Sequence, residues 1–149
     1  MKNVLVFYYS RTGNTEKMAE AVADGIRKAG GIKVDMEYYK DASELPNYDA
    51  IIIGTPTYHH DTVLEIKSLF ENAAVKNVIL KGKVSASFGS YGWSGEAPRL
   101  VLEIMEKRFE MDVIKPPLLI KYTPSEDDLE RCREFGRMIG EGLYMENNI

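Results

Sequence analysis

The stretch YYSRTGNTEKMAEAV, residues 8–22, decides the fold, because its character changes twice within a short distance. The apolar run that leads into it ends in small hydroxyl residues and one glycine. Beyond this bend, apolar residues recur at steps of three or four from Met18 to Ala29, where Gly30 and Gly31 interrupt the pattern. A continuous apolar run is typical of a strand covered on both faces, and the later spacing is typical of one helix face. The stretch therefore predicts a buried strand, a polar bend and a helix.

Strand-like and helix-like patterns alternate along the rest of the chain. Further strands are predicted near residues 34–38, 48–54, 83–90 and 116–122, and further helices near 63–73, 97–105 and 124–143. For the last helix, Thr123 is expected as the N-cap, Pro124 as the first helical residue and Glu126 as the returning carboxylate of a capping box. Short connections between alternating elements favour an α/β fold with a doubly wound, five-stranded parallel sheet and helices on both faces.

Length and composition predict one globular domain over residues 1–149. Hydrophobic residues make up 44% and charged residues 28%, which is a globular composition and unlike that of a disordered chain. The net charge of -4 argues against a nucleic-acid-binding face. Because the sequence shows neither a leader nor a membrane-spanning apolar stretch, a cytoplasmic protein with no membrane or nucleic-acid partner is expected. The single cysteine, Cys132, is expected to be a buried structural thiol.

In a doubly wound sheet, ligands bind beyond the carboxyl ends of the strands. The loop after the first strand is rich in hydroxyl and amide side chains and opens a helix, whose first N–H groups attract anions. The loop carries neither a Walker lysine nor a G-x-G-x-x-G pattern. Two interpretations of the loop are open: a phosphate site built from neutral donors, or a hydroxyl-rich helix cap without a ligand. Arg11 either contacts the phosphate or points to solvent. The candidate phosphate-binding residues are Ser10, Arg11, Thr12, Gly13, Asn14 and Thr15.

Aromatic residues mark the loops after the third and fourth strands. His59 and His60 are adjacent and therefore point different ways, so a shared metal ion is not expected. Ser94 is either a ligand contact or a helix N-cap. Two aromatic loops beside a phosphate loop imply a ligand with a planar ring system. The candidate residues in these loops are Thr55, Pro56, Thr57, Tyr58, His59, Ser90, Tyr91, Gly92, Trp93 and Gly95.

Over essentially its whole length the chain resembles a short-chain flavodoxin, on the motifs YYSRTGNTEKMA, GTPTYHHD and GSYGWSG. It is also similar to the flavodoxin domain of flavodiiron proteins. The resemblance implies the strand order 2-1-3-4-5, for which flavodoxin is a standard example. It also implies FMN as the cofactor, with its 5′-phosphate in the first loop, Trp93 stacked on the flavin ring and Tyr58 covering the other face.

The function that this resemblance implies is low-potential electron transfer, with donor and acceptor redox proteins docking at the flavin edge. A monomer is expected, although the sequence leaves the oligomeric state open. The alternative is an FMN-dependent NAD(P)H:quinone-type reductase, which uses the same fold and cofactor. A phosphorelay receiver is excluded, because Gly54-Thr55 and Tyr9-Ser10 stand where its aspartates would be required.

The sequence departs from the flavodoxin pattern at His59. Many flavodoxins have glycine after the residue that covers the ring, and the peptide at that position reorients on reduction. If the reoriented form needs a positive φ, a residue other than glycine costs about 1–2 kcal/mol more. We therefore expect this reorientation to be less favourable than in relatives that carry glycine.

Overall fold

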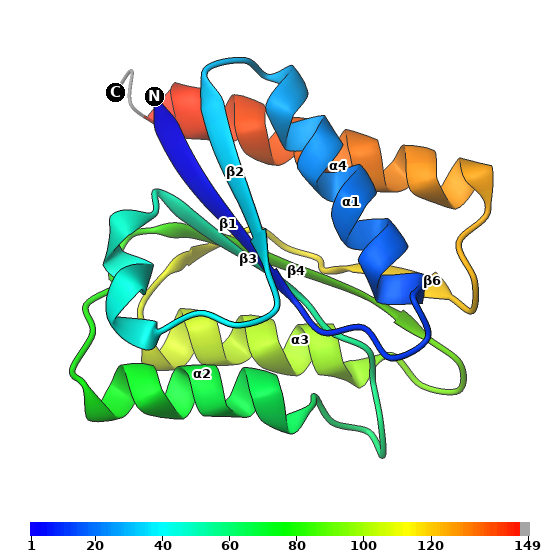
Figure 1. Cartoon of the computed structure of the whole chain (residues 1–149), viewed down its shortest axis with the longest axis horizontal. Coiled ribbons are helices and arrows are strands. Elements are labelled where there is room, and N and C mark those ends of the chain that lie inside the picture. Colours follow the sequence, from blue (N-terminus) through cyan, green and yellow to red (C-terminus); the bar gives the residue numbers. More distant parts are fainter. Residues whose placement is uncertain (147–149) are drawn as a thin grey trace.

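A computed structural model describes residues 1–146, which form a parallel sheet covered by helices on both faces (Figure 1). The strands are β1 (Lys2–Tyr8), β2 (Ile32–Glu37), β3 (Ala50–Gly54), β4 (Val84–Tyr91), β5 (Asp112–Val113) and β6 (Leu118–Lys121). The helices are α1 (Asn14–Lys28), α2 (Leu64–Val75), α3 (Glu96–Glu103) and α4 (Glu126–Glu146). A 3₁₀ helix, η1 (Ala42–Asn47), and a π-helical turn, η2 (Ile104–Arg108), complete the elements.

The strand order is β2-β1-β3-β4-β5, with β6 also paired to β4, and all pairs are parallel. The predicted fold class and order are therefore confirmed. One detail of the prediction is wrong, because the fifth position of the sheet is shared by two short strands. β5 pairs with Val84 and Ser85, whereas β6 pairs with Phe88 to Tyr91. The two-residue β5 is too short to show a period-2 pattern in the sequence.

Two hydrophobic cores lie on opposite faces of the sheet. Helices α1 and α4 cover one face, and α2 and α3 cover the other (Figure 1). In β1, Val4 and Val6 belong to the first core while Leu5 and Phe7 belong to the second. All four side chains are buried, which explains why this strand is a continuous apolar run rather than an alternating one.

Helices α1 and α4 cross in close contact at two glycines. A methyl group added at Gly136 would lie 2.0 Å from the carbonyl oxygen of Val22, and one added at Gly25 would lie 2.0 Å from that of Arg133. These distances are far below van der Waals contact, so each helix packs directly against backbone of the other. Both glycines are required by this close approach and not by an unusual φ.

Helix α4 begins later than the sequence predicts. The N–H of Asp128 donates to Ser125 Oγ (3.1 Å), and the N–H of Ser125 donates to Asp128 Oδ2 (3.0 Å). This reciprocal pair is a capping box with Ser125 as the N-cap, so the assignment of that role to Thr123 was wrong. The stretch contains two overlapping capping signals, and Glu126 binds Arg133 instead of returning to Thr123.

Cys132 lies on the buried side of α4, as expected, and the structure predicts that its thiol is unreactive in the folded protein. Burial raises the pKa of this thiol to about 12, so the nucleophilic thiolate is scarce at neutral pH. We expect no measurable reaction with a disulfide reagent such as DTNB at pH 8 in the native protein. One equivalent should react in guanidinium chloride. Rapid labelling of the native protein would contradict this assignment.

Candidate functional site

The three candidate loops leave the same edge of the sheet, because β1, β3 and β4 are adjacent and parallel (lower right in Figure 1). Side chains connect them in pairs. Thr15 Oγ1 lies 3.0 Å from Ser90 Oγ, which joins the first loop to the third. The guanidinium of Arg11 lies 5.5 Å from the centre of the Tyr58 ring, which joins the first loop to the second. The structure thus brings together the loops that the sequence analysis selected.

The first loop presents backbone donors at the start of α1. Gly13 precedes the helix with a φ of 91°, in the left-handed region that glycine tolerates. The N–H of Lys17 makes a bond to the Gly13 carbonyl (3.0 Å), and the N–H of Glu16 donates to Ser10 Oγ (3.1 Å). Asn14 and Thr15 are the first two residues of the helix, so their N–H groups have no carbonyl acceptor within it. A phosphate group fits this set of neutral donors at the positive end of the helix dipole.

The side chains of the first loop differ in what they contact. Ser10 and Thr15 already make hydrogen bonds within the protein, but each hydroxyl can still serve as donor and acceptor. Arg11 is exposed, and its guanidinium lies over the face of Tyr58. At the bend, Thr12 is exposed and Asn14 is partly exposed.

In the second loop, the first three predicted site residues mainly pack the loop. Thr55 is fully buried, and its hydroxyl contacts the Pro56 carbonyl (2.8 Å) and Thr62 Oγ1 (2.7 Å). Thr57 Oγ1 accepts a hydrogen bond from the N–H of Ala97 (3.0 Å). Tyr58 is half-buried, and burial raises the pKa of its phenol. Among the predicted residues of this loop, Tyr58 and His59 therefore present the largest accessible side chains.

Residues 58–61 form a tight turn with two strained histidines. The N–H of Tyr58 donates to the Asp61 carbonyl (2.9 Å), and the N–H of Asp61 donates back to the Tyr58 carbonyl (3.0 Å). His59 and His60 have φ values of 50° and 65°, as a type I′ turn requires at its two central positions. Such positions favour glycine and asparagine, and a residue of another type costs about 1–3 kcal/mol.

This turn corrects the sequence argument about His59. That argument placed the cost of a positive φ only in a reoriented form of the loop. The structure shows the positive φ already present in this conformation. The penalty expected on reorientation therefore stays a prediction, and it requires more than a positive φ that only the reoriented form would have.

The third loop carries the most exposed aromatic side chain of this edge. Trp93 is 88% exposed and follows β4, with Gly92 before it and Gly95 directly before α3. The N–H of Tyr122 donates to the carbonyl of Tyr91 (2.7 Å), which ties the end of β4 to the end of β6. Ser94 is not the N-cap of α3, since that position belongs to Gly95; its hydroxyl lies 3.2 Å from His60 Nδ1.

The sequence analysis missed other residues at this edge. Tyr39, which follows β2, is 77% exposed, and Tyr38 was assigned to a strand that in fact ends at Glu37. Tyr122 follows β6 and is also exposed. Tyr38 and Tyr122 lie at the last position of predicted strands and Tyr39 directly follows one, and this was the available signal. The pairing of His60 with Glu96 (3.1 Å) had no signal, because the two residues lie far apart in sequence.

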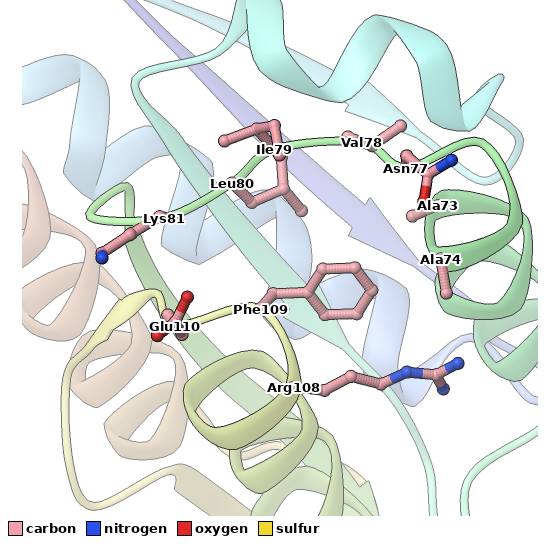
Figure 2. A pocket seen from close by; sticks show the side chains of 10 residues that line it. All are labelled: Ala73, Ala74, Asn77, Val78, Ile79, Leu80, Lys81, Arg108, Phe109 and Glu110. Carbon is pink, nitrogen blue, oxygen red and sulfur yellow. The ribbon is translucent and has the colours of Figure 1, made fainter.

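A separate hollow of about 340 Å³ lies at the opposite edge of the sheet (Figure 2). It lies between the end of α2 and the segments that precede β4 and β5. Figure 2 shows the ring of Phe109 between the segment of residues 77–81 and the side chain of Arg108. Because it lies at the amino ends of the strands, this hollow does not belong to the candidate site.

Comparison with known proteins shows which proteins the chain is similar to. Residues 6–136 match the family model described as flavodoxin. The chain is 36% identical to "Type A flavoprotein fprA" of Rhodobacter capsulatus over 95% of its own length and 33% of that protein. It is 34% identical to "Flavo-diiron protein FprA2" of Clostridium acetobutylicum, of which it covers 36%. The chain thus spans about a third of the length of these curated relatives.

Among solved structures, the chain is similar to a flavodoxin from the domain Archaea. The TM-score is 0.86 at 36% identity, over 97% of this chain and 99% of the other. It is also similar to rubredoxin oxygen:oxidoreductase from Desulfovibrio gigas, with a TM-score of 0.86 at 26% identity, over 100% of this chain and 38% of the other.

Proposed function

Because this chain belongs to the flavodoxin family, an FMN-binding family of electron carriers, we propose that it carries electrons at low potential between redox proteins. The observation that supports this most directly is the arrangement of groups at one edge of the sheet. There, a helix start with free N–H groups lies beside two loops that carry Tyr58 and Trp93. A phosphate donor set and aromatic rings at one site suit a phosphorylated planar cofactor.

The residues divide into two roles in this proposal. The backbone around Gly13, with the hydroxyls of Ser10 and Thr12, would hold the FMN phosphate, while Trp93 and Tyr58 would hold the ring. FMN, when bound, supplies the one-electron chemistry. Thr55, Pro56 and Thr57 support the second loop from behind, and the bond between Thr15 and Ser90 fixes the distance between the other two loops.

The partners in this proposal are redox proteins that dock beside the exposed aromatic residues. Aromatic side chains supply much of the contact area in protein interfaces.

No helix among the described residues is long and apolar enough to cross a membrane. The Type A flavoprotein and the flavodiiron protein among the relatives are about three times longer than this chain, so their reactions are not carried over to it. Within residues 1–146 no cluster of His, Cys, Asp and Glu could hold a metal ion.

The test is an absorbance spectrum of the purified protein followed by stepwise reduction with dithionite. Flavin bands at about one FMN per chain, bleaching in separate one-electron steps, would support an electron carrier. Direct passage to the two-electron form, together with turnover of NAD(P)H and a quinone, would favour the reductase instead. A protein that neither contains nor takes up FMN would contradict both functions.

A further inference from the structure

His60 connects the two loops that carry the aromatic residues of the site. Its Nδ1 atom lies 3.1 Å from Glu96 Oε1 and 3.2 Å from Ser94 Oγ. Its ring centre lies 5.2 Å from that of Trp93, with the planes tilted by 55°. The His60 side chain of the second loop therefore contacts three residues of the third loop. They are Trp93, Ser94 and Glu96, the last of which is the first residue of α3.

The backbone at His60 is strained, and local structure gives no reason for a histidine there. A φ of 65° at the second central position of a type I′ turn suits glycine, because glycine has no Cβ. Strain of this kind persists where the surrounding structure requires the side chain. The neighbouring His59 is equally strained at 50° but has no polar partner among the contacts of the described residues. The contacts of His60 therefore distinguish it from its neighbour.

The carboxylate that His60 contacts is ionised. The pKa of Glu96 is lowered to about 2, first by the Ser94 hydroxyl and next by His60, so this carboxylate stays ionised at any physiological pH. Its Oε2 atom is buried and has no hydrogen-bond partner among the described residues. The other charged groups nearby are Asp61, which is neutralised by Lys67, and Arg11, which lies over Tyr58.

We propose that His60 is a positioning residue, which holds Trp93 and the start of α3 against the second loop and does so most strongly when its imidazole is protonated. Histidine changes charge between about pH 5 and 8, and Glu96 remains ionised throughout that range. The ion pair between His60 and Glu96 therefore forms as the pH falls through this range and is lost as the pH rises. This inference rests on the proposed function, because the Trp93 loop is positioned for FMN.

Positioning of this kind acts on cofactor affinity through preorganisation. A loop that is already held in place loses less conformational freedom when a ligand binds. FMN should therefore bind more tightly at pH 6 than at pH 8.5. The contribution is that of an exposed ion pair, so the difference due to His60 is about two- to fivefold in the dissociation constant.

The test compares His60→Gln with His59→Gln, since both variants replace a histidine at a positive φ in the same turn. Trp93 is the only tryptophan, so its fluorescence reports this loop alone in the full chain before FMN is added. We expect the emission of the parent and of His59→Gln to change between pH 5 and 8, and that of His60→Gln to stay constant. Glu96→Gln should also remove the change in emission, because the anion that pairs with His60 is gone.

FMN binding is then measured in the same variants by quenching of flavin fluorescence. His60→Gln should raise the dissociation constant about two- to fivefold at pH 6 and hardly at pH 8.5, whereas any effect of His59→Gln should be the same at both pH values. An emission of the parent that does not titrate, or a titration that survives in His60→Gln, would overturn the proposal. If no variant binds FMN while the emission still depends on His60, the proposed function fails but the positioning of Trp93 stands.

Discussion

Replacing Trp93 with alanine is expected to raise the FMN dissociation constant about 5- to 150-fold, since stacking of an aromatic side chain on a flat base is worth about 1–3 kcal/mol. The indole is 88% exposed, so its removal costs the folded chain almost no buried area. The free energy of unfolding without FMN should therefore stay within about 0.5 kcal/mol of the parent value. Isothermal titration with FMN and urea denaturation measure the two quantities.

Tyr39→Ala is the matched control for this experiment. Tyr39 is also an aromatic residue at the carboxyl edge of the sheet and is 77% exposed, but it follows β2 and lies outside the three loops. Its replacement should leave FMN affinity unchanged. Equal effects from both variants would mean that Trp93 has no specific contact with the ring.

Replacing Gly136 with alanine is expected to lower the free energy of unfolding by about 3 kcal/mol, the upper part of the range for overpacked cores. The added methyl group would lie 2.0 Å from the Val22 carbonyl oxygen, which is backbone and cannot rotate away. Helices α1 and α4 would have to separate, and the core on that face of the sheet would loosen. The midpoint of urea denaturation measures this loss.

Gly142→Ala provides the opposite expectation in the same helix. A methyl group added at Gly142 meets no atom within 4 Å. Alanine favours a helix over glycine by about 1 kcal/mol, so this variant should be more stable than the parent by up to that amount. If both substitutions changed stability in the same direction, the close approach of α1 and α4 at Gly136 would not be the cause.

Local patterns in the sequence were sufficient for most of the architecture. The run from Val4 to Phe7 is buried on both faces of the sheet, and that is why its apolar residues are continuous. The helix face of Met18, Val22 and Ile26 is buried as its spacing predicts. Both features depend on the period of a single element, and a period can be read from neighbouring residues.

Prediction was weaker where two signals overlapped or a signal was too short. The capping patterns that begin at Thr123 and Ser125 are both plausible, and only the contacts of Asp128 and Glu126 in the folded chain select the second. The two residues of β5 show no period at all. Their place in the sheet depends on the neighbouring β4, which lies more than twenty residues earlier in the chain.

The sequence by itself determined the order of elements, the polar bend before α1 and the edge of the sheet where the candidate residues meet. Tertiary structure alone decided which of those residues face the site: Thr55 is buried against Thr62, whereas Trp93 is exposed. It also decided that Arg11 covers Tyr58 and that His60 meets Glu96. The physical reason is that such contacts depend on how strands pair and helices pack, and residues distant in the chain carry no local pattern that records these distances.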